Sequence, residues 1–348
     1  MGSTPPLADR LRQQADHCRA AGSPLTAALL EGAAGELGTG GPVDRLLGPL
    51  EDDPPGTVPA LRFAGALHRL VLERQAPGLA VHYPSVGGTP GEVWPAARAA
   101  VEEHLERLHE LVRRPVQTNE VGRSSALLGG LLVVASATGL PVRLLEVGAS
   151  GGLNLQVDRY RHEVAAGVVL GDPASPVVFD APWGGTPPRA VPLRIVERRG
   201  CDPEPLDPTS AEDRLTLTSY VWADQLARFE RLRGALQVAA ARPEPVERLA
   251  GSAFLERELR RPRPGVATVV WQSVVRQYLD PAERDRVEDV LAGAGRRATD
   301  EAPLACLTLE PERGVGVDRF VVELTSRPGA GTRLLADCGG HGPPITWR

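Results

Sequence analysis

The part of this chain whose residue types and spacing best support chemistry is a turn of small residues after an apolar run. Glu146 lies near the end of that run, and Gly148, Ser150 and Gly152 follow it at alternate positions. Where a strand opens through glycines into the N-terminus of a helix, backbone N–H groups without intrahelical partners can bind a nucleotide or another anion. The segment therefore predicts a strand, a ligand-binding turn and the start of a helix.

Three functional interpretations of this turn remain open. The dinucleotide fingerprint requires glycine at the first, third and sixth positions, but Ser150 and Leu153 occupy two of them. The G-x-S-x-G nucleophile elbow is matched in full from Gly148 to Gly152, with Ser150 as the nucleophile. The acid-x-G-x-G-x-G turn of class I S-adenosylmethionine (SAM) methyltransferases is matched by Glu146 and both glycines, with Ser150 replacing the middle glycine. A purely structural turn is the fourth reading, because Gly and Ser are common in tight turns.

Composition limits the classes of function. The chain has 348 residues, enough for a large core and two lobes, and its 42% hydrophobic and 24% charged residues are ordinary for a globular protein. With a net charge of −5 and no long basic cluster, no nucleic-acid partner is expected. The longest apolar candidate, Ala126–Leu140, is shorter than a membrane span, and no signal peptide is recognisable. We therefore expect a cytoplasmic protein with no membrane partner.

Several kinds of chemistry are excluded by residue type. All 39 basic residues are arginines, so the chain offers neither a lysine Schiff base nor the lysine of a P-loop. The four cysteines are scattered without a C-x-x-C pair, and the histidines show no H-E-x-x-H spacing. No metal site is predicted.

The elements that must position the turn fall into two parts. Residues 1–120 show apolar residues at helical spacing and predict an all-helical N-terminal lobe, whereas 121–348 alternate between helix and strand patterns, with a β-rich insertion at about 158–190. Alternation predicts a parallel sheet, and a closing hairpin gives it seven strands, the class I methyltransferase plan. The predicted helices are 7–21, 24–37, 58–73, 94–113, 121–138, 210–240, 253–259 and 281–292; the predicted strands are 142–147, 191–197, 246–249, 267–271, 304–309, 319–325 and 333–337, with turns at 166–167 and 326–331.

This layout disfavours the esterase, in which several strands precede the elbow. About 140 mostly helical residues precede Ser150 here. The chain order of Ser150, an acid such as Asp202 or Asp280, and a late His341 still suits a hydrolase triad. A serine hydrolase therefore stays as an alternative.

Five segments together resemble a known family. They are Tyr83–Gly88, Gln117–Arg123, Leu144–Leu155, Arg199–Asp202 with Pro205–Asp207, and Val269–Leu279. Over nearly the whole chain the sequence resembles the bacterial family called domain of unknown function 2332. The resemblance implies a Rossmann-like fold similar to class I SAM methyltransferases, and it carries no established reaction.

The methyltransferase pattern implies a cofactor site for SAM. The turn would meet the amino-acid end of the cofactor, Glu146 would orient the turn or bind the amine, and Asp202 would hold the two ribose hydroxyls. Ser252 stands where an acid often meets the adenine amine and offers only a hydroxyl. The cofactor-binding residues predicted in this way are Glu146, Gly148, Ala149, Ser150, Gly152, Asn154, Asp202 and Ser252.

Six further residues are candidates for the substrate pocket. They are Asn119, Glu120, Arg123, Gln272, Ser273 and Tyr278. Purely structural roles compete for three of them: Asn119 could cap a helix, and Glu120 and Arg123 could form a surface ion pair. The family commonly shows histidine where Gln272 stands, and glutamine cannot act as a general base. Methyl transfer depends mainly on in-line positioning and does not need one. The leading prediction is a SAM-dependent, methyltransferase-like protein for a small molecule; the alternatives are the Ser150 hydrolase and a non-catalytic nucleoside-binding or interaction protein.

Overall fold

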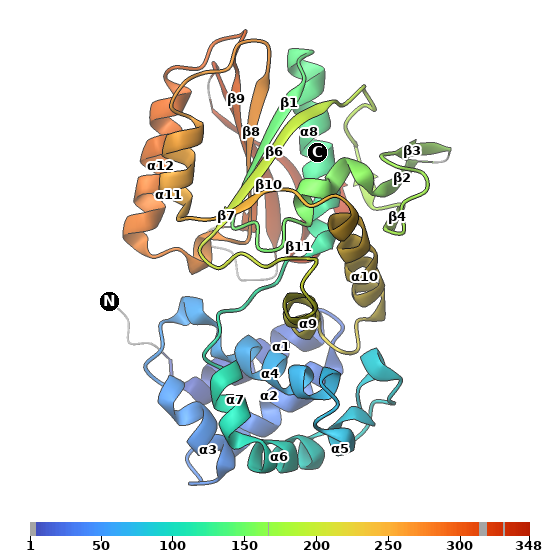
Figure 1. Cartoon of the computed structure of the whole chain (residues 1–348), viewed down its shortest axis with the longest axis vertical. Helices are drawn as coiled ribbons and strands as arrows, with labels where there is room; N and C mark the ends of the chain where they lie inside the picture. The colour runs from blue at the N-terminus through green and yellow to red at the C-terminus, as the bar shows by residue number, and fades with distance from the viewer. Residues whose placement is uncertain (1–4, 166, 313–318, 330) are drawn as a thin grey trace. The chain divides into compact units, whose positions relative to one another are not determined.

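The chain divides into two compact units. A computed structural model describes residues 5–165, 167–312, 319–329 and 331–348. Unit 1 comprises Met1–Thr118 with Ala211–Glu230, and unit 2 comprises Asn119–Ser210 with Arg231–Arg348 (Figure 1). Ala166 of the predicted turn at 166–167 and Ala330 of the predicted loop at 326–331 lie outside the described residues.

Unit 1 is helical throughout its described residues. Among its described residues, four α-helices begin with proline, at Pro24, Pro42, Pro59 and Pro77, and the fixed φ of proline suits the first helical position. Its elements are α1 (Leu7–Ala20), α2 (Pro24–Glu36), α3 (Pro42–Leu47), η1 (Gly48–Leu50), η2 (Pro55–Thr57), α4 (Pro59–Leu72), α5 (Pro77–Ala80), η3 (Pro84–Val86), α6 (Trp94–Glu103), α7 (Leu105–Leu111) and α9 (Ala211–Ser219).

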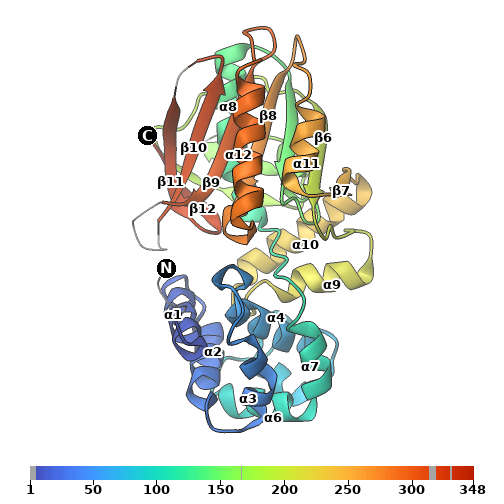
Figure 2. The same ribbon diagram turned by 90° about the vertical axis from the view of Figure 1, so that its left-hand side faces the viewer.

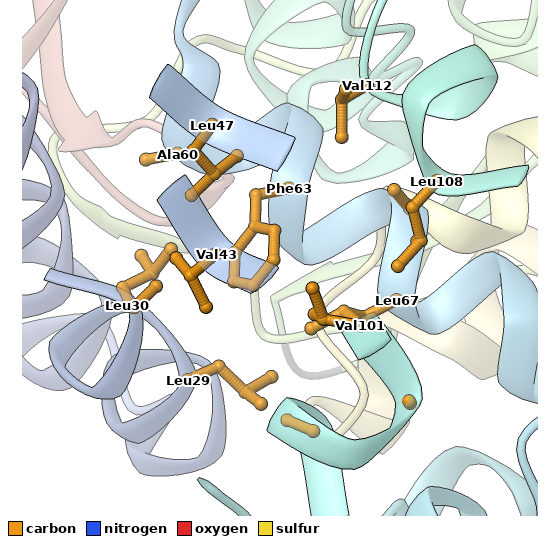
Figure 3. Packing of buried hydrophobic residues seen from close by; sticks show 14 of the residues in the cluster. Leu29, Leu30, Val43, Leu47, Ala60, Phe63, Leu67, Val101, Leu108 and Val112 are labelled. Atoms are coloured by element: carbon orange, nitrogen blue, oxygen red, sulfur yellow. The ribbon is translucent and has the colours of Figure 1, made fainter. Parts of the chain in front are cut away.

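The core of unit 1 is formed by apolar side chains from several of these helices. Phe63 and Leu67 of α4 are fully buried and lie among side chains of α2, α3, α6 and α7 (Figure 3). The periodicity of α4 explains this position, because residues four apart share one face of a helix. Unit 1 therefore has an apolar core of its own.

Two predicted helices are each divided in the structure. The predicted helix at 94–113 is α6 followed by α7, because His104 adopts a non-helical conformation with φ −115° and ψ 28°. The predicted helix at 210–240 is α9 followed by α10 (Leu226–Ala241). Between them, Trp222 and Ala223 are buried in the core of unit 1, so tertiary packing overrides the helical pattern.

Unit 2 is built on a nine-stranded sheet in the order β5-β12-β11-β10-β9-β8-β1-β6-β7. Strands β7, β6, β1, β8 and β9 pair in parallel, and β10, β11 and β12 continue the sheet as an antiparallel meander. The strands are β1 (Val142–Val147), β5 (Trp183–Gly185), β6 (Ile195–Asp202), β7 (Val246–Arg248), β8 (Ala267–Ser273), β9 (Leu304–Pro311), β10 (Phe320–Arg327), β11 (Thr332–Gly339) and β12 (Gly342–Trp347).

The mixed α/β class with a large parallel sheet is confirmed, and the seven-stranded plan is wrong. The predicted terminal hairpin is present as β10 and β11. Beyond it, β12 pairs with β11, and β5 from the β-rich insertion pairs with β12. β5 has three residues, and β12 contains Pro343 and Pro344, which argue against a strand, so neither was recognised from the sequence.

Helices cover both faces of the sheet (Figures 1 and 2). One face carries η4 (Val121–Arg123) and α8 (Ser124–Thr138), and the other carries α11 (Gly251–Glu258) and α12 (Pro281–Gly295). Close approach of α8 depends on two glycines, because a Cβ at Gly129 would collide with Trp347 and one at Gly130 with Leu307.

The stretch Val121–Thr138 differs from the expectation that no segment is long enough to span a membrane. Among the described residues it is long and apolar enough by length and composition. However, 78% of it is buried inside the protein, where it contacts the sheet. That burial is what the core helix of a globular unit shows.

The β-rich insertion contributes to two sheets. Strands β2 (Arg161–Ala165), β3 (Val168–Leu170) and β4 (Val178–Asp180) form a separate sheet in the order β3-β2-β4, whereas β5 joins the main sheet. Two short 3-10 helices complete the unit, η5 (Asn154–Arg159) and η6 (Arg276–Tyr278). The helix expected after the glycine turn is η5, a single short 3-10 segment with no α-helical N-terminus.

Candidate functional site

The polar residues of interest gather where the strand order of the parallel sheet reverses. From β1 the chain proceeds to β6 and β7 on one side, and it then returns to β8 and β9 on the other. In open parallel sheets, ligands bind outside the carboxyl ends of the strands at such a switch point. The glycine turn begins directly after β1, so it lies at this point.

The glycine turn has three residues with positive φ. Gly148, Ser150 and Gly152 have φ of +74°, +50° and +69°. Glycine is required at the first position for packing as well, since a Cβ there would lie 2.5 Å from Cγ2 of Val275. Ser150 is the exception, because a non-glycine residue in the left-handed region is strained, and such strain is often found at functional sites.

Hydrogen bonds hold this turn against the end of β6. The N–H groups of Gly148 and Ala149 donate to the carbonyl oxygen of Cys201 at 2.9 and 3.0 Å. The N–H of Ser150 donates to Oδ2 of Asp202 at 3.0 Å. Asp202 therefore reaches the turn, although 52 residues separate it from Ser150.

Asp202 fixes the turn and its own loop at once. Its Oδ1 accepts a hydrogen bond from the N–H of Glu204 at 2.9 Å, while Oδ2 is used by Ser150. A carboxylate oxygen has two lone pairs, so each oxygen keeps one for a further donor. The side chain is 7% exposed, and this position suits a hydroxyl group brought by a ligand.

One backbone donor in the turn differs from its neighbours. Among the backbone–backbone hydrogen bonds of the described residues, none uses the N–H of Gly151 as its donor. The N–H of Gly152 donates to the carbonyl of Ala149 at 2.7 Å, and the N–H of Leu153 donates to Oδ1 of Asn119 at 2.9 Å. The hydroxyl of Tyr160 donates to the carbonyl of Leu153 at 2.6 Å. The turn is thus held on both sides of Gly151, which is itself buried.

Glu146 is a buried acid with one satisfied oxygen. It lies on the α8 face of β1 and is 1% exposed. Its Oε1 accepts from Nδ2 of Asn154 at 3.3 Å, and Oδ1 of Asn154 accepts from the hydroxyl of Ser124 at 2.7 Å. Oε2 has no hydrogen-bond partner among the described residues.

The surroundings of Glu146 favour its neutral form. Burial raises the pKa of Glu146 to about 8, and the nearby charge of Asp202 adds to the increase. The hydrogen bond from Asn154 and the positive charge of Arg123 act in the opposite direction and are outweighed. Near pH 7, most of this group is a protonated carboxylic acid, which can donate as well as accept. Strongly shifted acids of this kind are frequent at functional sites.

Trp271 is the neighbour of Glu146 across the strand pair. The two residues are in register on β1 and β8, so their side chains project from the same face. The indole Nε1 of Trp271 is also buried without a partner among the described residues. Two adjacent side chains therefore each have an unused polar atom on the α8 face.

Arg123 brings a positive charge to the same strand ends. Its Nε donates to the carbonyl of Gly340 at 2.9 Å and its Nη1 to the carbonyl of Ser273 at 3.1 Å. Its charge works to lower the pKa of Glu146, although burial outweighs it there. Tyr278 lies on η6 with 42% of its surface exposed.

Asn119 and Glu120 each accept a hydrogen bond from a backbone N–H through a side-chain oxygen. Asn119 bonds to Leu153, whereas the capping residue of η4 is Glu120, whose Oε1 accepts from the N–H of Gly122 at 2.9 Å. Asn119 thus connects the segment before α8 to the glycine turn, and it does not cap the helix.

Two of the predicted residues are separated from Glu146. Along β8, Trp271 belongs to the cluster under α8 and Val270 to the cluster under α11 and α12, so Gln272 faces the latter. Its Nε2 is buried without a partner among the described residues. Ser252, at the start of α11, is engaged by Glu283, which accepts from its N–H and its hydroxyl at 2.8 Å each.

Sequence analysis missed one acid at the strand ends. Glu310 lies near the end of β9, where its Oε1 accepts from the N–H of Val275 at 3.1 Å. Burial raises the pKa of Glu310, while backbone donors and the charges of Arg276 and Arg123 oppose the increase. The signal was an acid immediately after the apolar stretch 304–309, the same pattern that singled out Glu146.

The fold and site define a mixed α/β protein whose ionisable residues gather at the carboxyl ends of its parallel strands. The family described as an uncharacterized protein conserved in bacteria (DUF2332) matches residues 8–347, nearly the whole chain. The chain belongs to this family, which confirms the resemblance found in its sequence. Searches of curated proteins and of solved structures give no match.

Proposed function

We propose that unit 2 binds SAM at the ends of β1 and β6 and that the chain is a SAM-dependent, methyltransferase-like protein acting on a small molecule. The observation that carries the proposal is the hydrogen bond between Ser150 N–H and Asp202. It joins the glycine turn after the first strand to the acid after its neighbour, at the switch point of the sheet.

The polar atoms left over at this site fit the polar ends of the cofactor. Gly151 N–H would bind the carboxylate of the methionine part. The ammonium group would favour the ionised form of Glu146, and Oε2 would then accept a hydrogen bond from it. Asp202 would accept from the ribose hydroxyls with its remaining lone pairs. Bound SAM would supply an electrophilic methyl group, and the protein would contribute position and exclusion of water.

The fit is weaker at the adenine end. Ser252, expected near the adenine amine, already bonds to both oxygens of Glu283. Gln272 faces the α11–α12 side, so it lies away from Glu146. Asn119, Arg123, Ser273 and Tyr278 remain as candidates on the substrate side, with Arg123 suited to an acceptor that carries a negative charge.

Calorimetry with SAM and S-adenosylhomocysteine tests the proposal, with ATP and NAD as competing nucleotides. Asp202→Ala should weaken SAM binding by about tenfold or more, because a charge-assisted hydrogen bond contributes about 1.5–3 kcal/mol. Glu204→Gln is the matched control, since this exposed acid lies in the same loop and the variant keeps the backbone N–H that bonds to Asp202. Absence of binding by the folded wild-type protein, or equal affinity in both variants, would contradict the proposal.

One observation favours the hydrolase as a second candidate. Ser150 has φ of +50° at the centre of a G-x-S-x-G turn, as expected of a strained nucleophile elbow. It is only 5% exposed, and Asp280, one of the acids considered for a triad, caps α12 by accepting from Glu283 N–H. Labelling of Ser150 by a serine-directed phosphonate would support this candidate. Binding of SAM without turnover on any methyl acceptor would instead support a non-catalytic role.

A further inference from the structure

Unit 1 contains a serine–histidine pair that the SAM proposal does not use. Ser85 lies on η3 and His68 on α4, and the hydroxyl oxygen of Ser85 is 2.9 Å from Nε2 of His68. The other ring nitrogen, Nδ1, is 3.2 Å from the carbonyl oxygen of Ser219. A carbonyl can only accept, so Nδ1 carries the proton and Nε2 accepts from the Ser85 hydroxyl.

The imidazole of His68 is buried, whereas Ser85, which bonds to it, is partly exposed. His68 is 2% exposed and packs against the rings of Tyr83 and Phe229, with centroid distances of 5.4 and 5.6 Å. Ser85 is half-buried and therefore reaches solvent. Burial lowers the pKa of His68 to about 4, so the ring is neutral at neutral pH.

The surroundings of Ser85 also indicate what it would act on. Tyr83, whose ring packs against His68, is 1% exposed, and its hydroxyl is buried without a partner among the described residues. Val81 and Val86 are among the few large apolar side chains that are exposed, at 60% and 45%. Val86 follows Ser85 directly in the chain, and exposed apolar side chains close in sequence to a nucleophile suit an apolar acyl group better than a charged one.

We propose that Ser85 is a nucleophile, with His68 as its general base, for esters that carry an apolar acyl group. Ser85 Oγ bonds to the ester carbonyl carbon as its proton passes to Nε2 of His68. The bond from that carbon to the alcohol oxygen then breaks, and the alcohol leaves with the proton from Nε2. Water attacks the acyl-serine, gives its proton to Nε2, and releases the acid as Ser85 recovers its proton.

Reaction of the full-length chain with an alkyl fluorophosphonate, followed by mass-spectrometric mapping, tests this proposal. Ser85 should be labelled in the native protein and not in the heat-denatured chain. His68→Gln should slow labelling by about 100-fold or more, the usual contribution of a general base. Thr89→Ala is the matched control, because it removes a hydroxyl four residues away and should label at the wild-type rate.

Three results would overturn the assignment. They are absence of label on Ser85, equal labelling of native and denatured protein, and an unchanged rate in a folded His68→Gln variant. The native-versus-denatured comparison needs no variant, so it holds even if His68→Gln fails to fold. Failure of SAM binding in unit 2 would not affect labelling of Ser85, and the reverse is also true, so the two proposals can fail separately.

Discussion

Each unit buries an ionisable side chain, a base in unit 1 and an acid in unit 2. Unit 1 buries His68 against a hydroxyl and a backbone carbonyl, and unit 2 buries Glu146 against an amide. In both cases burial is the largest cause of the pKa shift, downward to about 4 for the imidazole and upward to about 8 for the carboxyl group. Burial favours the neutral form whatever the sign of the charge. Glu146 and His68 should therefore reduce stability at opposite ends of the pH scale, Glu146 as the pH rises and His68 as it falls.

The largest expected effect comes from the separate cores. Phe63→Ala in unit 1 should lower the free energy of unfolding by about 3–5 kcal/mol, because it removes a fully buried ring (Figure 3). Leu144→Ala in the sheet of unit 2 should cost about 2–5 kcal/mol for the same reason. Urea unfolding of each variant measures both costs. A loss below about 1 kcal/mol for Phe63→Ala would show that the helices of unit 1 close around the cavity.

The next largest effect is a decrease in the free energy of unfolding at alkaline pH, caused by Glu146. Its carboxyl group ionises near 4.5 when unfolded and near 8 when folded, so its contribution to stability is full below 4.5 and is lost as the pH rises through 8. Between pH 5 and pH 8 the loss should be about 3 kcal/mol. Glu146→Gln keeps the shape and cannot ionise, so its unfolding free energy should lack this component. Equal pH profiles for the two proteins would contradict a neutral Glu146.

The features predicted correctly from the sequence are those marked by neighbouring residues. The bounds of β1 were predicted correctly, because Pro141 and Gly148 mark its ends, and α1 and α2 begin where predicted. The glycine turn was also found, since its small residues follow one another in the sequence. Residues that end helices and strands, and the periodicity of apolar residues, can be recognised in a single sequence.

Long-range packing was not visible. The stretch Ala267–Trp271 is apolar at every position but Thr268, so the sequence could not show which face Gln272 would occupy. The segment Ala211–Glu230 clusters with unit 1, because Trp222 and Ala223 fill its core. Nothing in the spacing of His68 and Ser85 indicated that the two side chains would meet, since they belong to different elements.

His68 should produce the smaller, acid-side loss. Its pKa is 6.5 when unfolded and about 4 when folded, so its contribution is full above 6.5 and is lost as the pH falls through 4. Between pH 7 and pH 5 the loss should be about 2 kcal/mol. The measurement is the difference in unfolding free energy between wild type and His68→Gln at each pH. Burial also lowers the pKa of His162 in unit 2 to about 4, so His162 reduces stability over the same pH range. Because both proteins contain His162, its contribution cancels in the difference.

The smallest effects should come from ion pairs at the surface, where solvent already stabilises each charge. Asp9 in unit 1 bonds to Arg12 with both side chains more than half exposed, so Asp9→Asn should cost less than about 0.5 kcal/mol. Asp337 in unit 2 is less exposed, and Arg319 and Arg348 both bond to it, so Asp337→Asn should cost more. Both costs should shrink in about 1 M salt, whereas the losses from His68 and Glu146 should persist because burial causes them. A salt-sensitive Glu146 effect would mean that neighbouring charges, rather than burial, set its pKa, and the contrast between the units would then fail.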